Sequence, residues 1–136
     1  MATIQQFEDL KVWQKTRSLC NEIFYLAETG KFSRDFGLKD QINRSSVSIM
    51  DNIAEGFGGK GNIEFINFLT YFGGSVCECK SQLYRAFGRK YIKEEKRKEL
   101  SDILDEINKM ISALITYLGE SDLRGIKFKG RNRKNS

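Results

Sequence analysis

The residue types that carry acid–base and metal chemistry are scarce in this chain. Histidine is absent, which removes the commonest general base and the commonest metal ligand. The three cysteines, Cys20, Cys77 and Cys79, include one Cys-x-Cys pair, but a structural zinc site needs four ligands, so we interpret them as small buried apolar residues. Ser48 and Glu55 do not complete a catalytic triad. We predict a protein that is not an enzyme and that uses no metal or cofactor.

A glycine-rich run, GFGGKG, occupies residues 56–61. It precedes a predicted helix but lacks both the spacing and the Ser or Thr of a P-loop. Its backbone amides and Lys60 could hold an anion at the start of that helix. A glycine-rich connector explains the run equally well.

Positive charge gathers in two stretches of the chain. Residues 80–98 hold eight cations against Glu94 and Glu95, and residues 124–136 hold six cations and no acid. Charge at this density binds phosphates in a salt-sensitive, sequence-tolerant way, and Tyr84 and Tyr91 could stack on unpaired bases. The candidate nucleic-acid-binding residues are Arg85, Arg89, Lys90, Lys93, Lys96, Arg97 and Lys98, together with Arg124, Lys127, Lys129, Arg131, Arg133 and Lys134.

The same division of charge suggests how the chain is organised. Its 136 residues fit a single domain, and residues 1–123 are close to neutral, with 17 cations against 18 acids. The last stretch has only Ile126 and Phe128 as apolar residues, too few for a core. We predict a bundle over residues 1–123 and a disordered basic tail over residues 124–136, which acts either as an arm for phosphates or as a solubilising terminus.

Four segments repeat apolar residues with the period of an α-helix: residues 9–28, 38–56, 62–87 and 93–118. The third is the most regular, since nine apolar residues between Phe65 and Phe87 fall within about 100° of arc. Each segment has one apolar face, and the connections are short. These features predict an all-α fold, a single antiparallel up-down-up-down four-helix bundle.

Two features go beyond the needs of a bundle. Gly73 and Gly74 lie inside the third predicted helix, where glycine costs about 1 kcal/mol relative to alanine; they indicate either close packing against a neighbouring helix or a kink. A polar stripe also follows the second predicted helix within about 80° of arc, and we interpret it as a solvated surface or a subunit interface. Its members are Gln41, Arg44, Ser48, Asn52 and Glu55.

Three separated runs carry a family resemblance: FEDLKVWQKTRSL at residues 7–19, FGLKDQINRSSVSIMDNIAEG at residues 36–56 and EFINFLTYFGGSVCECKSQL at residues 64–83. They resemble the four-helix-bundle proteins encoded in bacterial 23S rRNA intervening sequences, often labelled the S23 ribosomal protein family. The pattern covers most of residues 7–118. Family positions include Trp13, Ala54 and Gly56 as well as the polar stripe.

The resemblance implies an antiparallel bundle that assembles into a homo-oligomeric ring, most often a pentamer. It also implies an association with RNA-related loci and a similarity to accessory proteins of diversity-generating retroelements, which bind nucleic acid and a reverse transcriptase. It does not supply a settled biochemical activity.

Two functions from different classes remain open. The first is an oligomeric nucleic-acid-binding module with RNA as the expected ligand, in which a ring multiplies each basic patch. The second is a scaffold or accessory subunit that recognises an acidic protein partner. No basic region followed by an apolar run opens the chain, and no stretch approaches the roughly 20 apolar residues that span a bilayer. We therefore expect a cytoplasmic protein without membrane contact.

Overall fold

The computed structural model describes residues 4–59 and 61–134, and their side chains as far as Glu120. Two short 3-10 helices and five α-helices make up this part of the chain, with no strand among the described residues. In chain order they are η1 (Phe7–Asp9), α1 (Lys11–Ala27), η2 (Gly30–Arg34), α2 (Phe36–Phe57), α3 (Asn62–Thr70), α4 (Phe72–Gly88) and α5 (Glu94–Lys134).

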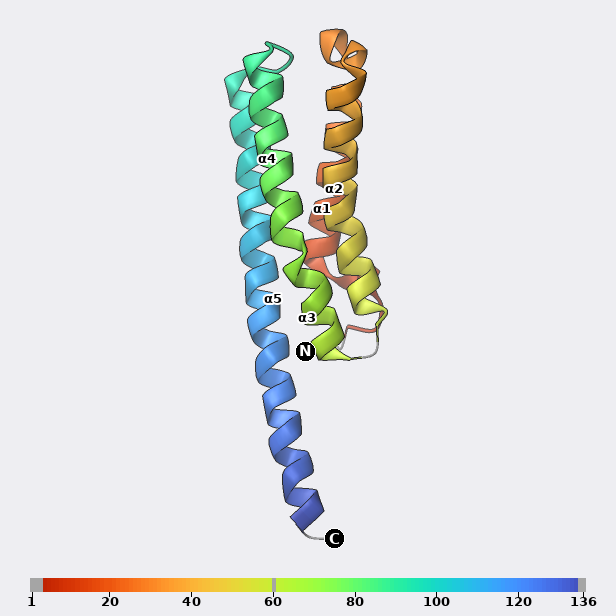
Figure 1. Cartoon of the computed structure of the whole chain (residues 1–136), viewed down its shortest axis with the longest axis vertical. Helices are drawn as coiled ribbons and strands as arrows, with labels where there is room; N and C mark the ends of the chain where they lie inside the picture. Colours follow the sequence, from red (N-terminus) through yellow and green to blue (C-terminus); the bar gives the residue numbers. More distant parts are fainter. Residues whose placement is uncertain (1–3, 60, 135–136) are drawn as a thin grey trace.

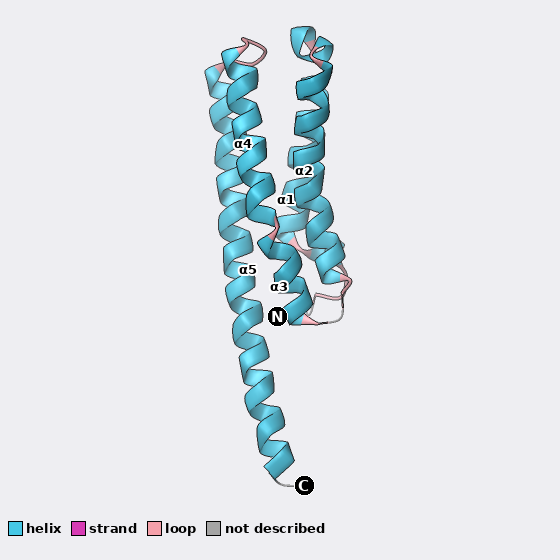
Figure 2. Ribbon diagram, in the orientation of Figure 1, coloured by secondary structure: helices cyan, strands magenta, loops and turns pink. Residues whose placement is uncertain are grey.

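The helices form the predicted antiparallel four-helix bundle, in which α3 and α4 together take the place of the third helix (Figures 1 and 2). Packing contacts join α1 to α2, α2 to α3 and α4, and α5 to α1, α3 and α4. No helix in the described part of the chain is long and apolar enough to cross a membrane.

The core follows the predicted apolar faces. On α2, Leu38, Ile42, Ile49 and Ile53 are completely buried, because residues three, four and seven apart share one face of a helix. The exceptions lie at the edges of the predicted faces. Phe24, at the edge of the apolar face of α1, is 47% exposed.

Helix α2 has clear start and end signals. The side chain of Asp35 accepts a hydrogen bond from the Leu38 amide (3.2 Å) and caps the first turn. Near its other end, a Cβ on Gly56 would lie 2.8 Å from both Phe65 and Phe68. Only glycine permits this close approach of α3 to α2, which gives a packing reason for glycine at this position.

The third predicted helix is interrupted at Tyr71, between α3 and α4. Close packing of Gly73 and Gly74 was one of two expectations, and it is wrong, since a Cβ on either would meet no atom within 4 Å. The other expectation, a kink, agrees with the break directly before them. Glycine has a low helix propensity, so the helix loses little by breaking here.

The fourth predicted helix is longer than expected. It was predicted to end at Leu118, but the backbone of α5 is helical to Lys134 and extends beyond the other helices (Figure 1). The end of the bundle at Leu123 is therefore not marked by a helix end. The division into a bundle and a tail stays a prediction, because the side chains beyond Glu120 lie outside the described part of the chain.

Candidate nucleic-acid interface

The connection between α1 and α2 meets the connection between α4 and α5 at one end of the bundle. Asp35 links them: its Oδ2 accepts hydrogen bonds from Arg89 Nη1 (2.6 Å) and from the Tyr91 hydroxyl (2.9 Å). The Tyr91 ring also stacks on Phe32, with 5.4 Å between the ring centroids. The two turns therefore form one continuous surface, which we call the basic end.

The electrostatics of this link favour the ionised carboxylate. The Leu38 amide has the largest effect in lowering the pKa of Asp35, followed by the Tyr91 hydroxyl, and Arg89 acts in the same direction. The same carboxylate raises the pKa of Tyr91. Because the folded pKa of Asp35 is depressed, its contribution to stability is present above the ordinary aspartate pKa and is lost as the pH falls through the folded value. The link therefore persists at neutral pH.

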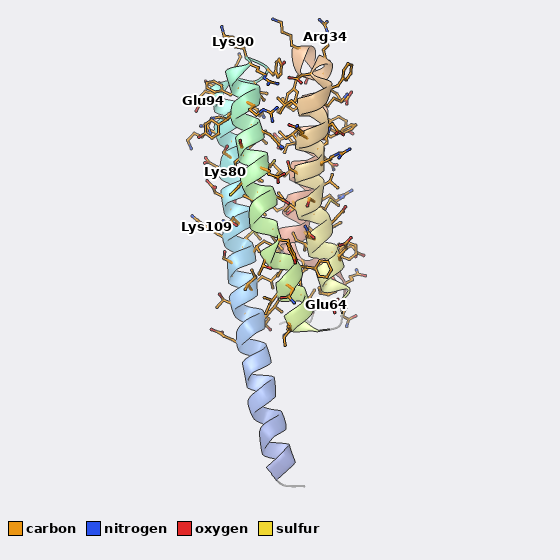
Figure 3. All side chains as sticks on the ribbon, in the orientation of Figure 1. Arg34, Glu64, Lys80, Lys90, Glu94 and Lys109 are labelled. Atoms are coloured by element: carbon orange, nitrogen blue, oxygen red, sulfur yellow. The ribbon has the colours of Figure 1, made fainter. Side chains whose placement is uncertain are left out.

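Helix α4 ends in a backbone motif that places Lys90 at this end of the molecule (Figure 3). The amide of Tyr91 donates to the carbonyl of Ala86 and the amide of Lys90 to that of Phe87, both at 2.9 Å, which is a Schellman motif. Lys90 takes the left-handed position, with φ of 64°. Glycine is the usual residue at this position, but the nearest one, Gly88, is the last residue of α4 itself.

Four of the seven cations predicted between residues 80 and 98 are already paired within the chain. Arg89 pairs with Asp35, and Arg97 pairs with Glu94. The guanidinium carbon of Arg97 also lies 4.4 Å from the centroid of the Tyr84 ring. The other pairs are Lys96 with Glu22 and Glu99, and Lys98 with Asp102. Arg97 is only 9% exposed, so it packs into the bundle rather than offering a charge to a ligand.

Three predicted cations keep their charge available at the basic end. Arg85 donates to the neutral amide oxygen of Gln41 (2.7 Å), so its charge is not compensated. Lys90 and Lys93 are exposed and form no ion pair with the described residues. These are the members of the predicted set that a phosphate could neutralise.

The structure adds two cations that the sequence prediction missed. Lys31 and Arg34 lie on η2, are exposed, and form no ion pair within the described part of the chain. The contacts of Asp35 and Phe32 with the turn after α4 bring η2 to the basic end. A signal for this existed, because an up-down-up-down bundle places its first and third connections at the same end.

The two tyrosines predicted to stack on bases are partly occupied. One face of Tyr91 is covered by Phe32 and its hydroxyl is bound to Asp35. Tyr84 is 55% exposed, with the Arg97 guanidinium over its ring. Neither ring is free on both faces.

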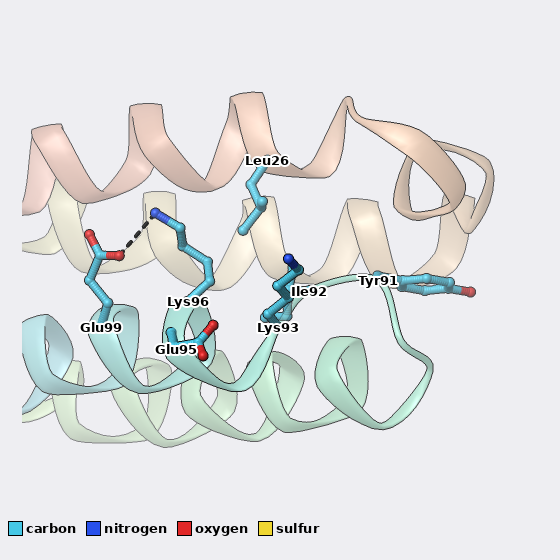
Figure 4. A pocket seen from close by; sticks show the side chains of 7 residues that line it. All are labelled: Leu26, Tyr91, Ile92, Lys93, Glu95, Lys96 and Glu99. Carbon is cyan, nitrogen blue, oxygen red and sulfur yellow. Dashed lines mark ion pairs between the residues drawn. The ribbon is translucent and has the colours of Figure 1, made fainter.

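A shallow hollow of about 360 Å³ lies beside the basic end, between α1 and the start of α5 (Figure 4). Leu26, Tyr91 and Ile92 give it an apolar lining. Its charged lining is balanced, with two lysines and two glutamates, and Lys96 pairs with Glu99 at 2.9 Å. This balance does not favour an anion, so the excess positive charge belongs to the turns rather than to the hollow.

The predicted tail cations and Lys60 of the glycine-rich run lie outside the residues whose side chains the structure describes. Their predicted contacts with phosphates therefore stay predictions. The tail set comprises Arg124, Lys127, Lys129, Arg131, Arg133 and Lys134.

The polar stripe on α2 divides into two groups. Three members are bonded within the chain: Gln41 to Arg85 (2.7 Å), Ser48 to Ser75 (3.0 Å) and Asn52 to Ser48 (3.3 Å). The buried Ser45–Gln82 hydrogen bond (2.6 Å) continues this seam between α2 and α4.

The remaining stripe residues face solvent. Arg44 is bonded to Asp40 (3.1 Å), four residues earlier on the same helix, and Glu55 is exposed without a partner in the described part of the chain. The stripe is therefore largely a contact between α2 and α4, together with an exposed Glu55 and an Arg44 that is paired on its own helix.

The cysteines differ from one another. Burial raises the pKa of Cys20 to about 11 and that of Cys79 to about 12, so both thiols stay protonated and unreactive. Cys77 is exposed, contrary to the prediction, because two residues along a helix turn the side chain by about 200°. The described residues contain no group of three or more acids and cysteines that could hold a metal ion.

The architecture defines the class of protein: an all-helical antiparallel bundle with a basic end. The family model of the 23S rRNA-intervening sequence protein matches residues 8–113, so the chain belongs to that family. A crystal structure of a protein of unknown function from the S23 ribosomal protein family of Bacteroides thetaiotaomicron is similar, with a TM-score of 0.68 and 25% identity. The match covers 76% of this chain and 97% of that chain. No curated protein matches this chain.

Proposed function

We propose that this protein is a cytoplasmic, non-enzymatic nucleic-acid-binding bundle that acts on RNA as a homo-oligomer. The observation that carries the proposal is the basic end, where Lys31, Arg34, Arg85, Lys90 and Lys93 have no carboxylate partner among the described residues. Phosphates neutralise such charges with release of counterions. Membership of a family named for an rRNA intervening sequence supports RNA as the nucleic acid.

Assembly would strengthen a weak site. One basic end offers a handful of phosphate contacts, whereas a ring of subunits presents several that can engage one RNA together. A pentamer is the assembly that the family resemblance favours. The expected binding is tolerant of sequence, because the chain has no base-reading sequence motif of the RNP or KH kind.

A salt titration with two charge variants tests the proposal. Binding of the full chain to a structured RNA is measured from about 50 to 200 mM salt, where a contact of several phosphates weakens steeply. The variant Lys90→Gln with Lys93→Gln removes two unpaired charges and is expected to weaken binding and reduce the salt slope by about two.

The matched control, Lys80→Gln with Lys98→Gln, removes the same net charge from lysines that pair with Asp105 and Asp102. It is expected to bind more tightly than the first variant. An equal loss of affinity in the two variants would mean that binding depends on net charge alone and not on the basic end. Absence of binding at about 150 mM salt would contradict the proposal.

The alternative function is a scaffold or accessory subunit for an acidic partner such as a reverse transcriptase or a ribosome-associated protein. It is supported by exposed apolar side chains elsewhere, namely Ile63 on α3, Tyr71 at the end of α3 and Tyr117 on α5, each more than 60% exposed. Phosphates gain nothing from such residues, whereas protein interfaces use them. A fixed stoichiometry with a protein partner, together with weak RNA binding, would favour this function.

A further inference from the structure

Phe36 is the most exposed large apolar side chain in the described part of the chain. It is 76% exposed and is the first residue of α2. The next most exposed aromatic rings, Tyr71 and Tyr25, carry a hydroxyl that water can solvate. Phe36 has no polar atom in its side chain, so its exposed surface is apolar and available for contact with another molecule.

The backbone that carries this ring is fixed from several sides. The preceding residue, Asp35, accepts hydrogen bonds from the Leu38 amide, from Arg89 and from the Tyr91 hydroxyl. These bonds tie the start of α2 both to its own first turn and to the turn after α4. A ligand would therefore meet a ring whose backbone is already ordered, which reduces the entropy lost on binding.

The surroundings of Phe36 along the chain and across the turn are cationic. Arg34 lies two residues before it and Lys31 earlier on η2, while Lys90 follows Arg89 in the opposite turn. The two carboxylates within a turn of Phe36 are both paired with arginines: Asp35 with Arg89 (2.6 Å), and Asp40, one turn further along α2, with Arg44 (3.1 Å). The chemistry that fits an exposed ring among uncompensated cations is an anion with a flat apolar face.

We propose that the basic end binds a single-stranded segment of nucleic acid, with one unpaired base stacked on Phe36 and adjacent phosphates held by Lys31, Arg34 and Lys90. A base offers its face only when it is unpaired, since a duplex buries the faces between neighbouring pairs. The proposal rests on the nucleic-acid-binding function above and adds to it the single-stranded form of the ligand and the residue that receives the base.

The test measures fluorescence anisotropy of a labelled ten-nucleotide oligouridylate, and of a duplex of the same length, with the full chain. Phe36→Ala is expected to weaken oligouridylate binding about 5- to 100-fold, the effect of losing one stacked base. The salt slope stays unchanged because no charge is removed. Phe36→Trp is expected to retain the affinity for oligouridylate. The affinity for the duplex is expected to change little in either variant, because a duplex offers no free base face.

Tyr117→Ala is the matched control, since Tyr117 is an aromatic residue of 64% exposure that lies about 35 Å along α5 from the start of that helix. It is expected to bind as the unaltered chain does. Circular dichroism melting of Phe36→Ala is expected to match that of the unaltered chain, because the ring has few contacts to lose.

The outcomes separate this proposal from the function on which it rests. Unaltered affinity in Phe36→Ala, with the salt slope kept, would overturn stacking and leave the phosphate contacts standing. Absence of binding to both the oligonucleotide and a structured RNA would overturn the nucleic-acid function itself. A lower assembly mass of Phe36→Ala in light scattering would show that another protein chain covers the ring, and would overturn the proposal.

Discussion

At the scale of single residues, the left-handed backbone of Lys90 is the clearest local departure from what its side chain prefers. A residue with a Cβ pays roughly 1–2 kcal/mol for that conformation, and among the described non-glycine residues only Lys90 adopts it, at φ of 64°. The strained residue lies on the surface that we propose to bind phosphates, and its side chain is a cation. A stable glycine end to α4 would lack that charge.

Lys90→Gly is expected to raise the free energy of unfolding by about 0.5–1 kcal/mol, because relief of the strain exceeds the added entropy of the unfolded chain. Urea denaturation followed by circular dichroism measures the change. Lys90→Ala is the control, since it removes the same charge but keeps the Cβ. Equal stability of the glycine and alanine variants would mean that the relief of strain does not exceed the entropy that glycine adds to the unfolded chain, and would contradict this prediction.

The sequence predicted which side chains are buried better than it predicted which charged side chains form ion pairs. Periodicity correctly placed Cys20 and Cys79 in the core and, by the same rule, should have excluded Cys77. The ion pairs of Lys96 with Glu22 and of Arg89 with Asp35 join residues 74 and 54 positions apart. Such pairs depend on how helices meet, so a count of cations along the chain overestimated the charge available to a ligand.

At the scale of elements, the glycines near the junction of α2 and α3 and those at the start of α4 have opposite roles. A Cβ at Gly56 would approach Phe65 and Phe68 to 2.8 Å, whereas a Cβ at Gly73 or Gly74 would meet no atom within 4 Å. The first glycine allows two helices to pack closely. The other two only weaken the helix that contains them.

The same substitution should therefore act with opposite signs. Gly56→Ala is expected to lower the free energy of unfolding by about 1–3 kcal/mol through overpacking. Gly73→Ala with Gly74→Ala is expected to raise it by about 1–2 kcal/mol through the helix propensity of the two residues. Urea denaturation at low protein concentration measures both, so that assembly does not contribute. Destabilisation by the alanine pair would contradict the assignment of these glycines to the break.

Helix existence and orientation could be predicted because each apolar face spans several turns and averages over local exceptions. Seven of the eight predicted helix ends also lie within two residues of those observed, and the exception is the end of α5. The exact position of the break in the third predicted helix and the backbone of the turn after α4 could not be predicted. The break at Tyr71 and the left-handed turn at Lys90 depend on a few backbone hydrogen bonds. Residue types other than proline differ in helix propensity by at most about 1 kcal/mol. Such differences are too small to decide, from the sequence alone, where a helix breaks or which residue takes the left-handed conformation.

At the scale of the whole molecule, topology creates the basic end. The cations of η2 are separated from those after α4 by more than fifty residues in sequence, and the antiparallel arrangement brings both turns to one end. Charge clusters along the sequence therefore identified half of this surface. The fold prediction itself already implied the other half, because the first and third connections of such a bundle must meet.

The exposed charges of the polar stripe give a prediction about assembly. Arg44 and Glu55 are eleven residues apart, about 16 Å along α2, so they cannot pair within one helix. Both residues lie on one face of α2, so in a self-complementary contact between two copies Arg44 of each copy can meet Glu55 of the other. Arg44→Ala or Glu55→Ala is expected to lower the mass measured by multi-angle light scattering.

Gln41→Ala serves as the control for this experiment, since Gln41 bonds to Arg85 inside the chain and its loss is expected to leave the mass unchanged. A charge exchange sharpens the test further. If the two residues meet across the interface, Arg44→Glu and Glu55→Arg should each dissociate the assembly through like-charge repulsion, while the double variant should restore it. Unchanged mass in every single variant would assign the stripe entirely to the seam between α2 and α4. A loss that the double variant does not rescue would mean that each charge meets a different partner on the neighbouring copy.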